Sequence, residues 1–272
     1  MKTARNENTD PSSSLGRAID VLGLFSLETP FLSVEEVGER LGYTRSTAYR
    51  YLKALGDGGL VASMSNGTYG LGPRIIELDR LLALTDPLYR AGKKVLGEYF
   101  SDHSALLLHS LYGDQVLCIH KEGPDQIVHK GKKITVGRAR GVPLPLFQGA
   151  ASLALLPFLS PHKIKETYLR HSGNIALAGL GGDWDEFRKN MTSIRRTGYA
   201  TTHDQIVSNM TGIAVPILLP EDRRLVGSLS KTFPTGSTHY KSVEAVVLEL
   251  RDMSEKISVE YLRASRRQSA AN

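Results

Sequence analysis

Two short helical patterns separated by a glycine turn constrain the fold of this chain more than any other feature. The segment that begins at Ser33 fits a capping box, because an acid, Glu36, follows three residues later. Gly42 is placed to end this helix, since glycine tolerates a positive φ. A second helix is expected to begin after Thr44, whose side chain can cap it. Two short helices joined by a turn of about four residues that contains glycine have the spacing of a helix-turn-helix.

The segments on either side complete a winged form of this motif. Residues 15–25 place apolar side chains at steps of three and four, which predicts an earlier helix. Residues 60–62 are expected to form a strand, and the Asn66-Gly67 pair that follows is the strongest short signal for a β-hairpin. The sequence therefore predicts a winged helix-turn-helix domain over residues 14–72, preceded by a disordered arm of residues 1–13.

The polar face of the helix after Thr44 contains the side chains best suited to contact DNA. Arginine is the commonest reader of guanine edges, and serine or threonine can contact bases or phosphates. The first residues of such a helix reach the bases, so its later cations are better placed for phosphates. A solvated helix face is the alternative interpretation. The candidate DNA-binding residues are Arg45, Ser46, Thr47, Tyr49, Arg50 and Lys53.

The net charge of +6 does not by itself identify a nucleic-acid partner. Residues 1–85 contain 9 Lys and Arg against 10 Asp and Glu, a balance of −1, which leaves 25 against 18, or +7, for the remainder. Only cations that face phosphates release counterions, so local placement matters more than the total.

The chain divides near Asp86. Residues 73–86 form an apolar helical stretch whose apolar arc is wide, which favours a linker helix that also pairs with a second subunit; an ordinary core helix is the alternative. Residues 87–265 mix strands and helices without strict alternation, which predicts an α+β sensor-type domain. We expect this domain to bind an effector and to oligomerise. The final residues, 266–272, are expected to be a disordered tail. In this domain we expect helices over residues 88–102, 148–159, 183–196 and 243–263, and strands over residues 105–111, 116–121, 127–129, 212–219 and 225–231.

Signals for catalysis, cofactors and metals are weak. The sequence contains none of the common nucleophile, phosphate-loop or zinc-protease motifs, so we expect neither an enzyme nor a cofactor. Cys118 and His120 would share one face of a strand, with His103, His109 and His129 nearby in sequence. Cys-x-His alone is a poor metal signature, so packed or surface histidines are expected instead of a metal site.

A ligand pocket can be assembled from two pieces of the second domain. Gly149 and the small residues after it lie at a helix start, where free N–H groups and the helix dipole favour an anion. Ser230 and Thr232 alternate on a strand, so both hydroxyls face one side. Together these pieces could bind a carboxylate, although tight helix–sheet packing also requires small residues. A nearby basic run could steer the anion or be a solvated loop: Lys130, Lys132, Lys133, Arg138 and Arg140.

Two further observations concern the environment of the chain. The single cysteine, Cys118, excludes an intrachain disulfide and fits a reducing cytoplasm. No apolar run reaches the roughly 18 residues that suggest a membrane span, and the polar N-terminus lacks a secretion signal. A cytoplasmic location without membrane contact is therefore expected.

Several segments resemble the IclR-type transcriptional regulators. The resemblance covers about residues 14 to 262 and implies a winged-helix domain, a linker helix and a GAF-like sensor domain. It also implies a homodimer or homotetramer that binds a palindromic operator in double-stranded DNA and responds to a small-molecule effector. The segments similar to the family's signatures are residues 15–22, 45–55 and 69–72 in the first domain, and residues 198–199, 211–216 and 226–230 in the second.

The resemblance also implies which residues form the pocket. They are Gly149, Ala150, Thr202, His203, Gly212, Ser230 and Thr232. Two pairs depart from the family's pattern: Asp204-Gln205 occupies the place of Gly-Glu, and Ser152-Leu153 that of Gly-Lys. Two alternatives remain open: a second domain that only oligomerises, and an enzyme with an accessory N-terminal module.

Overall fold

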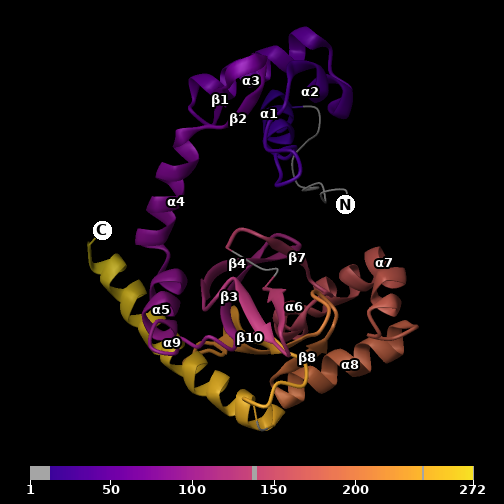
Figure 1. Cartoon of the computed structure of the whole chain (residues 1–272), viewed down its shortest axis with the longest axis vertical. Coiled ribbons are helices and arrows are strands. Elements are labelled where there is room, and N and C mark those ends of the chain that lie inside the picture. Colours follow the sequence, from indigo (N-terminus) through magenta and orange to yellow (C-terminus); the bar gives the residue numbers. More distant parts are fainter. Residues whose placement is uncertain (1–12, 137–139, 241, 272) are drawn as a thin grey trace. The chain divides into compact units, whose positions relative to one another are not determined.

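The chain forms two compact units, one up to Thr85 and one from Asp86 onward. The structure is a computed structural model that describes residues 13–136, 140–240 and 242–271 (Figure 1). The predicted arm therefore lies outside the described residues, except for Ser13, which caps the first helix by accepting a hydrogen bond from the Gly16 amide.

In the N-terminal unit, the described residues before Pro73 form three α-helices and a hairpin. The predicted capping box is present, because the Glu36 side chain accepts from the Ser33 amide at 2.7 Å and the Ser33 hydroxyl accepts from the Glu36 amide at 3.1 Å. Gly42 ends the second helix with a φ of 70°. The elements are α1 (Ser14–Leu22), α2 (Val34–Leu41), α3 (Arg45–Asp57), β1 (Val61–Ser63), the single turn η1 (Ser65–Gly67) and β2 (Tyr69–Leu71).

The inner face of α3 is the centre of this unit's core. Ala48 and Leu52 are fully buried, and Val21 of α1 and Val37 of α2 pack into the same cluster. At the hairpin tip both Asn66 and Gly67 adopt a φ of 72°, the left-handed conformation for which Asn-Gly is favoured. The predicted winged helix-turn-helix is confirmed.

The next helix, α4 (Pro73–Thr85), has no buried residue. Its apolar side chains are exposed: Ile76 is 74% exposed, Leu81 52% and Leu82 59%. Within this chain α4 is therefore not an ordinary core helix, which was one of the two interpretations of its sequence.

The C-terminal unit is built on a six-stranded antiparallel sheet in the order β7-β4-β3-β10-β9-β8. A separate pair, β5 and β6, forms a small hairpin. The strands are β3 (Ala105–Tyr112), β4 (Gln115–Glu122), β5 (Gln126–His129), β6 (Lys132–Thr135), β7 (Pro143–Pro145), β8 (Ala200–His203), β9 (Met210–Leu218) and β10 (Leu225–Pro234).

Helices cover both faces of the sheet. On one face α5 and α9 pack against inward side chains such as Leu108, Ile213 and Leu229. On the other face α6, with α8 behind it, packs near Ala214. The helices are α5 (Pro87–Leu96), α6 (Ala150–Leu155), the single turn η2 (Leu156–Phe158), α7 (Pro161–Leu177), α8 (Trp184–Thr197) and α9 (Val243–Ala271) (Figure 1). The α+β class predicted from the sequence is confirmed.

The structure corrects two expectations for this unit and adds elements that were not expected. The helix expected over residues 88–102 ends at Leu96. The expected disordered tail is wrong for residues 266–271, because α9 continues to Ala271. Residues 264–271 contain several good helix formers and no glycine or proline, so nothing in them interrupts the helix. The sequence analysis also missed α7 and the short strands β6, β7 and β8.

Candidate DNA interface and effector pocket

The predicted DNA-binding face of α3 is open to solvent. Arg45, Ser46, Tyr49, Arg50 and Lys53 are all exposed, on the side of the helix opposite its buried stripe. Arg45 forms an ion pair with Glu35 of α2 at 3.0 Å, and its side chain remains 81% exposed. An exposed pair of this kind contributes little to stability, so DNA can compete for the guanidinium.

Thr47 differs from the other candidates. It is half-buried, and its hydroxyl accepts from the hydroxyl of Thr44, the residue that caps α3, at 2.9 Å. The Ser46 hydroxyl also lies 3.2 Å from that of Thr44, but Ser46 is exposed whereas Thr47 is half-buried, so Thr47 is the less accessible of the two to a base.

The start of α3 and the tip of the hairpin border one hollow. Its lining residues come from α2, α3 and the hairpin: Val34, Arg45, Ser46, Tyr49, Gly67 and Tyr69. The hairpin thus stands beside the candidate base-reading residues, in the place where a wing can contact the DNA next to the helix.

The second unit contains a pocket between α6 and the sheet, closed in part by Val136 and by the loop after β8. Its cavity measures about 70 Å³. A water molecule needs roughly 10–15 Å³, so the cavity holds several waters or a small organic molecule. Six of the seven predicted effector residues line it: Gly149, Ala150, Thr202, Gly212, Ser230 and Thr232.

The seventh predicted residue, His203, does not reach the pocket. Side chains alternate along β8, so His203 points to the face opposite Thr202. There its Nδ1 lies 3.0 Å from the hydroxyl of Thr211. The prediction that His203 lines the pocket is wrong for this reason.

Gly149 has a role that the sequence analysis missed. Its φ of 83° places the chain at the start of α6, and its N–H donates to Oε1 of Gln205 at 2.8 Å. Nε2 of the same amide donates to the carbonyl of Ala178, just after α7, at 3.4 Å. The expected free N–H at this position is therefore taken by Gln205, one of the two residues noted as a departure from the family's pattern.

The other departure, Ser152-Leu153, faces away from the pocket. Both side chains are buried in α6 on the side of the core, and neither lines the cavity. These residues therefore affect how α6 packs instead of contacting a ligand directly.

The two predicted hydroxyls of β10 differ in their partners. Thr232 donates to the carbonyl of Thr211 at 3.3 Å. Ser230 is only 6% exposed, lines the pocket, and its hydroxyl makes no hydrogen bond with any described residue. Two residues earlier, Ser228 donates to the carbonyl of Ala151 at 3.0 Å and so ties β10 to α6. Of these three hydroxyls, that of Ser230 is the one available to a ligand.

The remaining lining residues are mostly apolar and were not predicted. Apart from Ala151, which follows Ala150 on α6, they come from separate strands and loops, so no local pattern in the sequence marks them. They are Leu107, His109, Val136, Leu144, Ala151, Gln205, Ile206, Val207 and Met210.

The basic run noted in the sequence does not line the pocket. Lys130, Lys132 and Lys133 are exposed on the β5–β6 hairpin. Arg140 donates to the carbonyl of Ile119, and Arg138 lies outside the described residues.

The expectation that Cys118 and His120 share a strand face is wrong. Adjacent residues of β3, Leu108 and His109, pair with His120 and Cys118, which are two apart on β4. The pairing therefore contains a β-bulge between Cys118 and His120. Cys118 packs in the cluster with Leu107, whereas His120 meets the ring of Tyr89 on α5. Burial lowers the pKa of His120 below its ordinary value. Among the described residues no group of three His, Cys, Asp or Glu could hold a metal ion.

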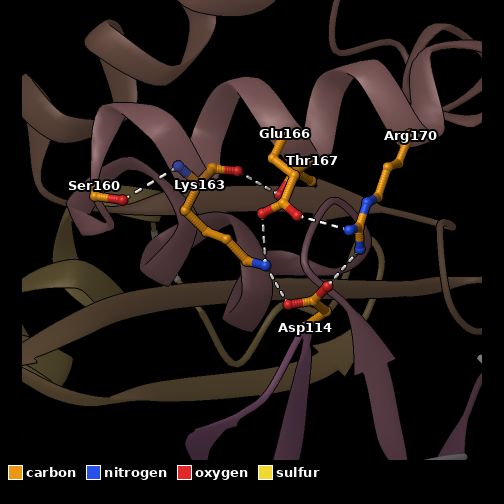
Figure 2. A network of polar contacts seen from close by, with 6 residues as sticks. All are labelled: Asp114, Ser160, Lys163, Glu166, Thr167 and Arg170. Carbon is orange, nitrogen blue, oxygen red and sulfur yellow. Dashed lines mark hydrogen bonds and ion pairs between the residues drawn. The ribbon is translucent and has the colours of Figure 1, made fainter. Parts of the chain in front are cut away.

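A closed ring of charges fixes α7 to the β3–β4 turn. Figure 2 shows Asp114 of that turn between two cations of α7, Lys163 and Arg170, while Glu166 of α7 contacts the same two. The hydrogen bond from Lys163 holds the pKa of Glu166 below its ordinary value.

Comparisons with known proteins match both units. The family model for the IclR helix-turn-helix domain matches residues 14–63, and that for the bacterial transcriptional regulator IclR C-terminal domain matches residues 101–259. Curated relatives include "Probable HTH-type transcriptional regulator ArcR" of Halobacterium salinarum, which is 24% identical over an alignment of 263 residues that covers 93% of this chain and 97% of that protein. KipR of Bacillus subtilis, an HTH-type transcriptional regulator, is 22% identical over 78% of this chain and 82% of its own length.

Solved structures show the same fold. An IclR transcriptional regulator from Alicyclobacillus acidocaldarius has a TM-score of 0.72 and 23% identity, covering 91% of this chain and 98% of that one. An IclR homologue from Microbacterium hydrocarbonoxydans, solved with 4-hydroxybenzoate, has a TM-score of 0.68 and 22% identity, covering 92% and 100%.

No described helix is both long and apolar enough to cross a membrane. The matched relatives are named as regulators of transcription and not as enzymes. With one family model on the DNA-binding unit and another on more than half of the chain, this protein belongs to the IclR family of transcriptional regulators.

Proposed function

We propose that this regulator reads a specific operator with the outer face of α3 and that a small organic effector, bound in the pocket beside α6, controls it. The exposed face of α3, beside the hairpin, is the observation that supports the first part. Arg45, Ser46 and Tyr49 lie at the start of α3 and are assigned to base edges, whereas Arg50 and Lys53 lie further along and are assigned to phosphates.

The buried Ser230 hydroxyl supports the second part, because it faces the pocket without a described partner. A buried hydroxyl of this kind is completed by a hydrogen bond from or to a ligand. Thr202 lines the same cavity, and the surrounding walls are mostly apolar. We therefore assign the effector a small apolar body with one polar end, and propose a carboxylate for that end, with Ser230 as its donor. The homologue solved with 4-hydroxybenzoate is complexed with a small aromatic carboxylate, which also has a hydroxyl at its other end.

A homodimer or homotetramer on a palindromic operator is part of the same proposal. The apolar side chains of α4, exposed within one chain, support pairing through this helix. A two-fold symmetric pair of recognition helices would bind half-sites about 10 bp apart, or a multiple of that distance.

Two measurements on the full-length protein test this proposal. The first is a footprint on the DNA flanking its own gene, which should reveal a palindromic protected site. The second is a thermal-shift screen with small aromatic and aliphatic acids, because a bound effector raises the unfolding temperature by mass action. If the protein protects a DNA site but no acid raises its unfolding temperature, the C-terminal unit only oligomerises. Absence of any protected site would refute the DNA assignment.

A further inference from the structure

A hollow on the C-terminal unit gathers four arginines. It lies where the end of α8, the end of β9, the β9–β10 turn and α9 meet, and it shares no lining residue with the effector pocket. Its ionisable lining residues are Arg195, Arg196, Arg223, Arg251 and Glu255. Among the described residues that line this hollow, there are thus four positive side chains and one carboxylate.

Two of these guanidinium groups are held in place by backbone carbonyls. Arg251 donates to the carbonyl of Thr197 at 2.6 Å. Arg195 donates to the carbonyl of Pro157 at 3.2 Å and lies over the ring of Phe158. A guanidinium has five N–H donors, so one carbonyl contact leaves others for a ligand. Because these groups are already positioned, they lose little conformational freedom when a ligand binds.

The side chains of the other two arginines, Arg196 and Arg223, make no hydrogen bond or ion pair with any described residue. Arg223 has acids on its own turn, but they contact different arginines: Glu221 pairs with Arg266 at 2.9 Å and Asp222 with Arg224 at 3.5 Å. Glu221 and Asp222, the acids nearest to Arg223 in sequence, therefore do not neutralise its positive charge.

Compensation of a helix dipole does not account for this arrangement. Cations favour the last turn of a helix, which explains Arg195 and Arg196 at the end of α8. It does not explain Arg223, which reaches the same hollow from the turn between two strands. Apolar side chains, including Val215 and Leu218, also line the hollow and offer a surface to an organic body.

We propose that this hollow, named here the arginine groove, binds a small organic phosphate. Guanidinium groups pair two N–H donors with two phosphate oxygens, and several of them together favour a ligand with at least two negative charges. The arginine groove would give the regulator a second ligand site, independent of the effector pocket and of α3.

Isothermal titration of the full-length protein, without DNA, tests this proposal. The probes are pyrophosphate, glucose 6-phosphate and ADP, of which the last two distinguish a sugar phosphate from a nucleotide. We expect at least one organic phosphate to bind, more weakly at high salt. Arg196→Gln and Arg223→Gln should each weaken binding about tenfold, the loss expected for one charge-assisted hydrogen bond. Arg223→Lys keeps the charge but not the paired donors. Its affinity for the organic phosphate should lie between that of the glutamine variants and that of the wild type.

The matched control is Arg224→Gln. Arg224 is adjacent to Arg223 on the same turn, but it pairs with Asp222 and does not line the arginine groove. It should bind the probes within about twofold of the wild type, as should Ser230→Ala in the effector pocket. If Arg224→Gln weakens binding as much as Arg223→Gln, a diffuse positive field explains the result and the site is refuted. Failure of both organic phosphates to bind at millimolar concentration, or a loss of binding in Arg50→Gln on α3, would refute it equally. Arg196→Lys replaces either glutamine variant that fails to fold.

Discussion

Two serines on one strand should separate ligand binding from stability. Ser228 and Ser230 lie on the same face of β10, and both are buried. The hydroxyl of Ser228 is bound to the carbonyl of Ala151, whereas that of Ser230 has no described partner and faces the pocket. Replacing each with alanine removes the same atom from two different environments.

The expected magnitudes follow from these environments. Ser228→Ala loses one buried hydrogen bond, so the free energy of unfolding should fall by roughly 0.5–1.5 kcal/mol. Ser230→Ala loses no hydrogen bond of the free protein, so its stability should change by less than about 0.5 kcal/mol. With a carboxylate effector, Ser230→Ala loses a charge-assisted hydrogen bond of roughly 1.5–3 kcal/mol, which weakens binding about tenfold to a hundredfold.

Urea unfolding and isothermal titration measure the two effects on the same proteins. The titration uses the acid that gives the largest thermal shift with wild type. DNA affinity without effector should be unchanged in Ser230→Ala, because the substitution lies in the other unit. If the effector binds wild type and Ser230→Ala equally well, the pocket has been assigned to the wrong place.

Two further predictions concern the charge ring and α4. The pKa of Glu166 lies below its ordinary value of 4.5, so the stability it adds is present above that value and is lost as pH falls through the lowered pKa. Glu166→Gln should therefore destabilise the protein at pH 7 but not in acid below the lowered pKa; an equal loss at both pH values in urea unfolding would contradict this. Leu81→Glu with Leu82→Glu should shift the oligomer toward monomer in light scattering, because each buried leucine contributes about 1.5–3 kcal/mol to an interface. Arg80→Gln on the same helix should have no effect, and a wild-type monomer at micromolar concentration would refute pairing through α4.

The DNA-binding unit could be predicted from the sequence because its signals are local. The capping box at Ser33, the glycine at position 42 and the Asn-Gly turn each act within a few residues, and the structure contains all three. The buried stripe of α3 follows from helical periodicity alone, so its exposed face was predicted with it.

The pocket was only partly predictable, because it depends on contacts between distant segments. Small residues and alternating hydroxyls indicated Gly149 and Ser230, but no pattern could show that Gln205, 56 residues from Gly149, occupies its N–H. His203 was misplaced because the sequence did not reveal the short strand β8, whose alternation turns it away. The bulge that separates Cys118 from His120 likewise arises from pairing with β3 and has no signal within β4.

One measurement tests most directly whether the outer face of α3 reads the operator. Binding of wild type, Arg45→Ala and Lys53→Ala is measured on the footprinted duplex and on a scrambled duplex at several salt concentrations. Arg45→Ala should weaken binding to the operator by about 1–3 kcal/mol and to the scrambled duplex much less. Lys53→Ala should weaken both duplexes alike and lower the salt slope by about one. If Arg45→Ala weakens both duplexes equally, or neither, α3 does not read the operator through Arg45 and the account is contradicted.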